Sequence, residues 1–226
     1  MKITFLGHSC LLIQANGKTI ITDPFIRANE LAKHINVTDL KPDYILITHA
    51  HQDHTLDVEE IANQSKTTLI SNWEIVNYFE KKGIKGHPMN TGGSWNFDFG
   101  KVICTLAHHS SSFADGTYGG NPNGYILEVE NKRIYIAGDT ALFTDMRLIP
   151  LTIGKLDLAV LPMGDNFTMG IKDSLIASDF LECKTVLAYH YDTFGYIKLD
   201  KKLASQTFSE NEKNLILLEI GQSMNL

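Results

Sequence analysis

A short histidine-rich motif limits what this chain can fold into more than any other feature. After the apolar run 43–48, which has the length of a buried strand, comes His49-Ala50-His51-Gln52-Asp53-His54, the pattern H-x-H-x-D-H. Side chains two apart in an extended chain point the same way, so His49 and His51 can converge on one cation. Asp53 and His54 lie where the chain turns and can face a second cation. Because the motif contains no cysteine, it indicates an open catalytic metal site rather than a closed thiolate site.

Further candidate ligands follow other expected strands. His108 and His109 come after the run 101–107, Asp139 after 133–137 and His190 after 185–189. Each stands where a strand would end, and loops at such ends gather into a common cleft. Strand alternation points only one of His108 and His109 inward. Imidazole and carboxylate ligands suit Zn, and also Mn or Fe.

The rest of the chain mixes short strands with helices. Asn16-Gly17 between two apolar runs predicts a tight hairpin, and Asn72 and Gly83 are a plausible N-cap and C-terminal stop for a helix. We expect strands at 2–6, 11–15, 18–22, 43–48, 68–71, 94–97, 101–107, 125–129, 133–137, 156–161, 185–189 and 215–220, and helices at 57–64, 72–82, 172–181 and in the charged stretch before 215. Two sheets with helices outside would accommodate this order. With no linker and no repeat, residues 1–226 are predicted to form one α+β domain.

Composition excludes several classes of protein. Lys and Arg total 20 against 26 Asp and Glu, a formal net charge of −6, and no long basic run occurs, so we expect no nucleic-acid partner. No apolar stretch is long enough for a bilayer span and no signal peptide is apparent, so we expect a cytoplasmic protein without membrane contact. Cys10, Cys104 and Cys183 are odd in number and far apart, which fits reduced thiols. A small-molecule substrate is the expected partner, and a homo-oligomer is left open.

Taken together, these motifs resemble the metallo-β-lactamase superfamily over nearly the whole chain. Its ligand order is H-x-H-x-D-H, a histidine, G-D-T and a late histidine. The segments Leu6 to Cys10, Thr22 to Phe25, Ala107 to Ser111, Gly164 to Gly170 and His190 to Phe194 look like its small branch of bacterial and archaeal metal-dependent hydrolases. L-ascorbate-6-phosphate lactonase and the N-acyl-phosphatidylethanolamine phospholipase D type are relatives in the wider branch. The resemblance implies a four-layer αββα sandwich with the metals at one edge.

The resemblance also implies a ligand set for two divalent cations, of which Zn comes first and Mn or Fe are alternatives. One metal would be held by His49, His51 and His109, and the other by Asp53, His54 and His190, with Asp139 bridging. The A-x-H-S-S pattern of the family selects His109 over His108. His34 and His87 match no family position and are expected to be ordinary surface or loop residues.

Two neighbouring cations can share a water, lower its pKa and polarise a substrate oxygen, so a metal-bridging hydroxide would be the nucleophile. We expect Ser110 and Ser111 to form hydrogen bonds rather than to attack the substrate. The catalytic candidates are Asp53 or Asp139 as a proton acceptor, and His8, which would either reach the cleft to contact substrate or be a buried histidine. The expected substrate is a small ester, lactone or phosphoester.

Two supporting segments are also candidates for the site. Asp23 is expected to orient a metal-bound histidine, with a strand-ending turn as its alternative. In Gly164 to Gly170, the residues Asn166, Thr168 and Met169 could line the pocket or cap the following helix.

The residues argue against three alternatives to hydrolysis. A mononuclear iron dioxygenase of the persulfide type uses similar histidines, but seven candidate ligands favour two metals. Flavodiiron oxygen reductases place Glu where this chain has His51. A non-catalytic scaffold with the same fold would typically have lost ligands, and none is missing here.

Overall fold

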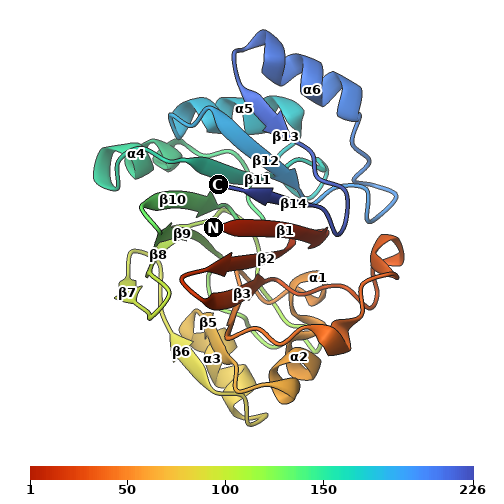
Figure 1. Cartoon of the computed structure of the whole chain (residues 1–226), viewed down its shortest axis with the longest axis vertical. Helices are drawn as coiled ribbons and strands as arrows, with labels where there is room; N and C mark the ends of the chain where they lie inside the picture. The colour runs from red at the N-terminus through yellow and green to blue at the C-terminus, as the bar shows by residue number, and fades with distance from the viewer.

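Two seven-stranded sheets face each other at the centre of the computed structural model, which describes residues 1–226, and helices cover their outer faces (Figure 1). The first sheet has the order β14 (Ser223–Asn225), β1 (Lys2–Gly7), β2 (Cys10–Ala15), β3 (Lys18–Thr22), β4 (Tyr44–Leu46), β5 (Thr68–Ser71) and β6 (Gly86–Pro88). The second has the order β13 (Asn214–Ile216), β12 (Thr185–Tyr189), β11 (Leu158–Pro162), β10 (Lys132–Ile136), β9 (Asn123–Val129), β8 (Lys101–Leu106) and β7 (Ser94–Asn96).

Helices form the two outer layers. On the first sheet lie α1 (Gln52–Thr55), α2 (Val58–Gln64) and α3 (Trp73–Glu80), and on the second lie α4 (Leu148–Thr152), α5 (Ile171–Phe180) and α6 (Lys201–Glu210) (Figure 1). The fold is therefore the αββα sandwich that the sequence predicts. None of these helices combines the length and the apolar character that a bilayer span requires.

Three apolar clusters join the four layers. A cluster of 22 buried residues fills the space between the sheets, while clusters of 19 and 17 buried residues lie beneath the helices of the second and first sheet. Strand alternation distributes the side chains among them. In β11, Val160 points to the other sheet, whereas Ala159 and Leu161 point to the helices. The sequence of a strand that is buried on both faces is a continuous apolar run, and β11 is an example.

The directions of the strands determine at which edge of the sheets the site lies. In the first sheet β3 and β4 are parallel, and β1 runs with them because both pair antiparallel to β2. In the second sheet β10, β11 and β12 are parallel, and β8 runs with them because both flank β9 antiparallel. The loops that follow these strands therefore leave from the same edge of each sheet, where α/β proteins bind ligands.

Several local predictions are confirmed. Asn16 and Gly17 both have positive φ, as a type I′ hairpin requires. Asn72 caps α3 by accepting a hydrogen bond from the amide of Ile75, and Gly83 beyond the helix has φ +83°. All three cysteines are buried free thiols.

The predicted strand 215–220 is wrong over its second half. Only Asn214–Ile216 pairs in the second sheet, because the chain then crosses to the first sheet, where the amide of Phe5 donates to the carbonyl of Gln222 and the amide of Gly221 donates to that of Phe5. The following strand β14 pairs with β1, so the two termini lie side by side (Figure 1). The sequence analysis missed β14, as well as β6, α1 and α4, each of which is only three to five residues long.

Candidate metal centre

Loops at the shared sheet edge bring together all the predicted ligands. The motif 49–54 follows β4, His109 follows β8, Asp139 follows β10 and His190 follows β12. Left-handed backbone at Gly138 and His190, with φ of +67° and +55°, turns the chain sharply at two of these strand ends. The ligand atoms fall into two groups and a third, made of His49, His54 and Asp139, that joins them; within each group the atoms lie within 4.8 Å of one another.

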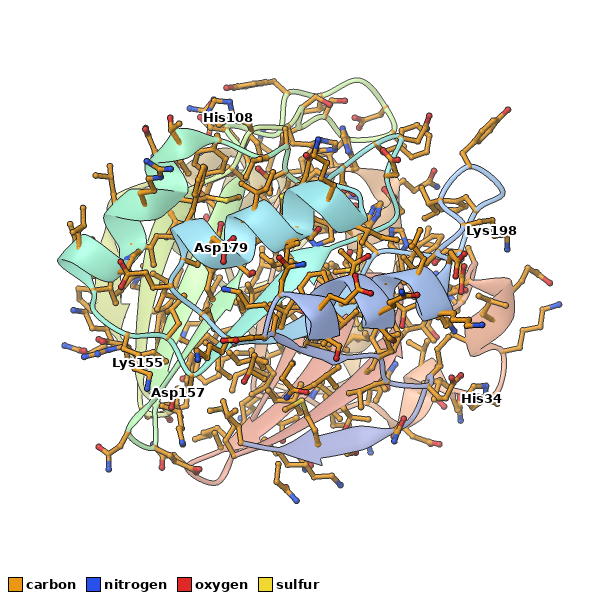
Figure 2. The ribbon with its side chains drawn as sticks, turned by 90° about the horizontal axis from the view of Figure 1, so that it is seen from above. His34, His108, Lys155, Asp157, Asp179 and Lys198 are labelled. Atoms are coloured by element: carbon orange, nitrogen blue, oxygen red, sulfur yellow. The ribbon has the colours of Figure 1, made fainter.

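The first group consists of His49, His51 and His109. Nε2 of His49 lies 2.9 Å from Nδ1 of His51, and the His109 ring stands edge-on to both rings at 5.0 Å. His108 points away from this group. Its side chain is exposed at the rim of the molecule (Figure 2) and stacks on Phe143. The structure thus brings the predicted histidine of the pair to the site.

The second group consists of Asp53, His54 and His190 together with His8. Asp139 lies between the two groups. Its Oδ2 is 2.9 Å from Nε2 of His190, 3.4 Å from Nε2 of His54 and 3.6 Å from Nε2 of His109. This is the position that a bridging carboxylate requires.

The donor atoms of the site fit divalent cations. Two ligand atoms about 2.1 Å from a tetrahedral Zn lie about 3.4 Å apart, close to the Asp139 distances above. Oδ1 of Asp139 and Nδ1 of His190 are buried and have no hydrogen-bond partner. An unsatisfied buried polar atom costs about 1–3 kcal/mol, and a cation at the centre of the group would remove that cost.

Charges in the site are arranged for cation binding. Burial lowers the pKa of His49, His51 and His109, so their nitrogen lone pairs are free at neutral pH. Burial alone would lower the pKa of His54, but Asp139, Asp23 and Asp53 raise it well above its ordinary value. Burial opposes ionisation of Asp139, yet His190 and His54 hold its pKa well below the usual range. A protonated His54 is then the positive charge that offsets the carboxylates.

Asp23 supports the site from below, as the sequence predicts. It is fully buried, and its Oδ2 lies 3.1 Å from Nδ1 of His54. It also accepts hydrogen bonds from the amide and the hydroxyl of Thr48, both at 2.8 Å. The Thr48 hydroxyl is in turn 3.0 Å from Nδ1 of His49. One carboxylate therefore orients a histidine of each group.

Of the two alternatives for His8, the structure shows the buried histidine: its ring lies behind Asp53 and is not among the residues that line the cleft over the predicted ligands. Its ring is buried, with Nε2 3.1 Å from Oδ2 of Asp53 and Nδ1 3.0 Å from the hydroxyl of Thr193. Burial, followed by nearby His190, lowers the pKa of His8 to about 4. A neutral ring between these two partners positions Asp53.

A cleft of about 790 Å³ opens over the predicted ligands. His51, Asp53, His109, Asp139 and His190 form its floor, and Ser110, Phe167, Thr193, Phe194, Gly195 and Tyr196 form the rest of its lining. Ser110 lies 3.1 Å from Nε2 of His51, whereas Ser111 accepts a hydrogen bond from the amide of Ala50. Both serines thus form the hydrogen bonds expected of them.

In the segment Gly164 to Gly170, the residue that lines the cleft is not one of the three predicted residues. Neither Asn166, Thr168 nor Met169 lines the cleft, and no side chain caps α5. Met169 is instead buried in the apolar cluster beneath the helices. Phe167 is the residue of this segment that reaches the cleft. A left-handed turn at Asp165 and Asn166 explains this, because it projects the next side chain outward.

Sequence reasoning also missed Thr48, Thr193 and the aromatic residues of the cleft. Thr48 immediately precedes the motif, and Thr193 stands in the segment after His190, so their positions were the available signal. Nothing in the residues around Tyr196 indicates that it lines the same cleft as the predicted ligands. Two histidines outside the family pattern, His34 and His87, take no part in either group, and His34 is exposed at the outer margin of the molecule (Figure 2).

Comparisons with known proteins agree with this geometry. A family model described as "Beta-lactamase superfamily domain" matches residues 2–190. Proteins named "UPF0173 metal-dependent hydrolase" from Flavobacterium johnsoniae and Christiangramia forsetii are 58% and 56% identical, each over 100% of both chains. Igni18, a metallo hydrolase from Ignicoccus hospitalis, superposes with a TM-score of 0.89 at 32% identity, covering 100% of this chain and 98% of its own. The chain therefore belongs to the UPF0173 metal-dependent hydrolases of the β-lactamase superfamily.

Proposed function

We propose that this metal-dependent hydrolase uses two divalent cations to cleave a small ester, lactone or phosphoester. One cation would be held by His49, His51 and His109, and the other by Asp53, His54 and His190, with Asp139 shared. Zn suits this set of nitrogen and oxygen donors best, and Mn or Fe are the alternatives.

The position of Asp139 is the observation that supports the proposal most directly. Its Oδ2 lies within 3.6 Å of histidine nitrogens of both groups, and its buried Oδ1 has no hydrogen-bond partner. A structural carboxylate in a core would normally have its oxygens satisfied. A shared ligand between two cations explains both the placement and the missing partner.

When bound, the cations supply an activated water and polarise the substrate oxygen. The side chains of the site would transfer the proton and orient the predicted ligands. Asp53 lines the cleft and is held by His8, so its carboxylate can take a proton from the attacking water and return it to the leaving group. Asp23 and Thr48 orient His54 and His49, which keeps the ligand nitrogens directed to the centre.

The test combines metal analysis with a substrate panel. Purified protein should retain about two metals per chain and hydrolyse at least one of an ester, a lactone and a phosphodiester. His54→Ala and Asp139→Asn should lower that rate by orders of magnitude with the fold retained, as judged by circular dichroism. His34→Ala, an exposed histidine outside the site, is the matched control.

Three outcomes would overturn the proposal. A metal-loaded protein without activity on any bond type would favour the scaffold alternative. A single iron with oxygen consumption would favour the dioxygenase alternative. Full activity in both site variants would place the chemistry elsewhere. The cytoplasmic location and a small-molecule partner stay predictions of the sequence.

A further inference from the structure

We propose that the cleft selects an uncharged carbonyl ester or lactone that carries a flat aromatic group, which packs against the exposed rings of Phe167 and Tyr196. This inference rests on the proposed function and narrows its substrate class. Phe167 and Tyr196 are the specificity-determining residues, and phosphoesters are disfavoured.

Two aromatic side chains stand exposed at the mouth of the cleft. Phe167 is 50% exposed and Tyr196 is 79% exposed, yet both line the same cleft as the predicted ligands. Their ring centroids are 6.4 Å apart with planes inclined at 76°. Exposed aromatic rings beside a concave site gain free energy when an apolar group covers them, and aromatic pairs prefer edge-to-face and offset geometries. The arrangement therefore suits a flat ring.

The loops that carry these rings are built to hold them in place. In the first loop, the amide of Asp165 donates to the carbonyl of Met169, and the amide of Met169 donates to the carbonyl of Thr140, beside Asp139. Phe167 is thus tied to the loop that supplies the bridging ligand.

The second loop is anchored in the same way. The amide of Ile197 donates to the carbonyl of Phe194, and the amide of Asp192 donates to the carbonyl of Ile197. Phe194 packs its ring against His8 and Phe25, with centroids 5.3 and 6.0 Å away. The loop that carries Tyr196 is therefore held by its own backbone hydrogen bonds and by the packing of Phe194.

Charge in the cleft argues against a phosphoester. None of the residues that line it is Lys or Arg, so apart from the cations of the proposed function the cleft offers no positive side chain to hold phosphate oxygens. Lys198 and Lys201 line a neighbouring cavity, which includes His34 and shares Thr193 with the cleft. Figure 2 shows Lys198 at the outer margin of the molecule. Lys201 is paired with Asp192 at 3.5 Å, so it is not free to serve the cleft.

The reaction that follows is a balanced hydrolysis. The oxygen of water bonds to the carbonyl carbon, the ester C–O bond breaks, and the leaving oxygen takes a proton, which gives one carboxylic acid and one alcohol. The cleft volume of about 790 Å³ accommodates a fused two-ring group beside the carbonyl.

The experiment compares 2-naphthyl acetate with ethyl acetate and bis(4-nitrophenyl) phosphate in metal-loaded protein. In Phe167→Ala/Tyr196→Ala, the ratio of kcat/KM for the naphthyl ester to that for the ethyl ester should fall about tenfold, because two aromatic contacts are lost. Trp95→Ala is the control. Trp95 is 54% exposed and pairs with Val102, at the end of β8 away from His109.

A binding measurement separates this proposal from the proposed function. Titration calorimetry of the non-hydrolysed 2-naphthamide should give a Kd that rises about tenfold in the double variant and is unchanged in Trp95→Ala. If the wild type turned over none of the substrates but still bound naphthamide about tenfold more tightly than the double variant did, the proposed function would be overturned and the aromatic subsite would stand. Equal effects on both esters with unchanged naphthamide binding, or faster cleavage of the phosphodiester than of the naphthyl ester, would overturn the present proposal.

Discussion

At the scale of single residues, Asp23 supports both ligand groups, one through His54 and the other through Thr48. It is buried beneath His54 and at the same time fixes Thr48, the neighbour of His49. Its backbone has φ +39°, a conformation that Asn and Asp tolerate better than other side chains. Both the charge and the backbone preference therefore make an acid suitable here.

Asp23→Asn should weaken metal binding by about 10- to 100-fold, because the amide keeps the shape and the left-handed backbone but loses the carboxylate that orients His54. Chelator competition measures the affinity. Asp43→Asn is the control, since this carboxylate accepts a hydrogen bond from Thr19 at the opposite end of β4. Equal affinity of the wild type and Asp23→Asn would show that the carboxylate does not orient the ligand.

His54 makes metal binding dependent on pH. The carboxylates of Asp139, Asp23 and Asp53 outweigh burial and raise its pKa well above the ordinary value, so the metal-free site carries a proton on His54 near neutrality. A cation must displace that proton. Metal affinity should therefore fall as the pH is lowered, by about tenfold per pH unit for one displaced proton.

Calorimetry in two buffers of different ionisation heat counts the released protons. His34→Gln should leave the count at the wild-type value, because His34 is exposed and outside both ligand groups. A metal affinity that does not change between about pH 6 and about pH 8 would contradict a protonated His54.

At the scale of the elements, the turns at strand ends determine where the predicted ligand side chains lie. Gly138, between β10 and Asp139, has φ +67°, and a Cβ there would lie 2.9 Å from the carbonyl oxygen of Asn123 and 3.0 Å from Cβ of Thr48. The close approach of three segments that surround the site thus depends on the absence of a side chain. Gly17 has a similar φ of +71° but open space around it.

Gly138→Ala should destabilise the protein by about 1–3 kcal/mol more than Gly17→Ala, since only the first variant adds steric overlap to the backbone cost that the two share. Urea unfolding measures the difference. Gly138→Ala should also weaken metal binding, because Thr48 and Asp139 must move. Equal stabilities and affinities for the two variants would mean that the loop has room for a side chain.

At the scale of the whole molecule, the predicted metal ligands come from both sheets. The motif 49–54 comes from the first sheet, whereas His109, Asp139 and His190 come from the second. The C-terminal segment joins the sheets again, since it leaves β13 in the second sheet and pairs as β14 with β1, the strand that His8 directly follows. Met224 and Leu226 also pack on the apolar cluster between the sheets.

Deletion of residues 221–226 should lower the urea midpoint and promote self-association, because β1 becomes an unpaired edge strand. Size-exclusion chromatography and urea titration measure both effects. Ser223→Ala is the control, as it loses only the hydroxyl contact with Thr4 and keeps the backbone pairing. A truncated protein with wild-type midpoint and elution volume would show that β1 needs no partner.

The sequence by itself determined the features that depend on neighbours in the chain. The spacing H-x-H-x-D-H after an apolar run placed the first predicted ligands, and the Asn16-Gly17 turn and the Asn72 cap followed from local backbone chemistry. The order of short strands and helices indicated two sheets with helices outside. Strand ends then indicated the loops that supply His109, Asp139 and His190, because the carboxyl ends of strands meet at one edge.

Only the tertiary structure decided what depends on contacts between distant segments. His8 is separated from Asp53 by 45 positions and from Thr193 by 185, so its place behind the site could not be seen in the residues around it. The same holds for Phe167 and Tyr196 at the mouth of the cleft and for the pairing of β14 with β1. Periodicity and turn chemistry act over a few residues, whereas these contacts arise from the packing of two sheets, which no local pattern encodes.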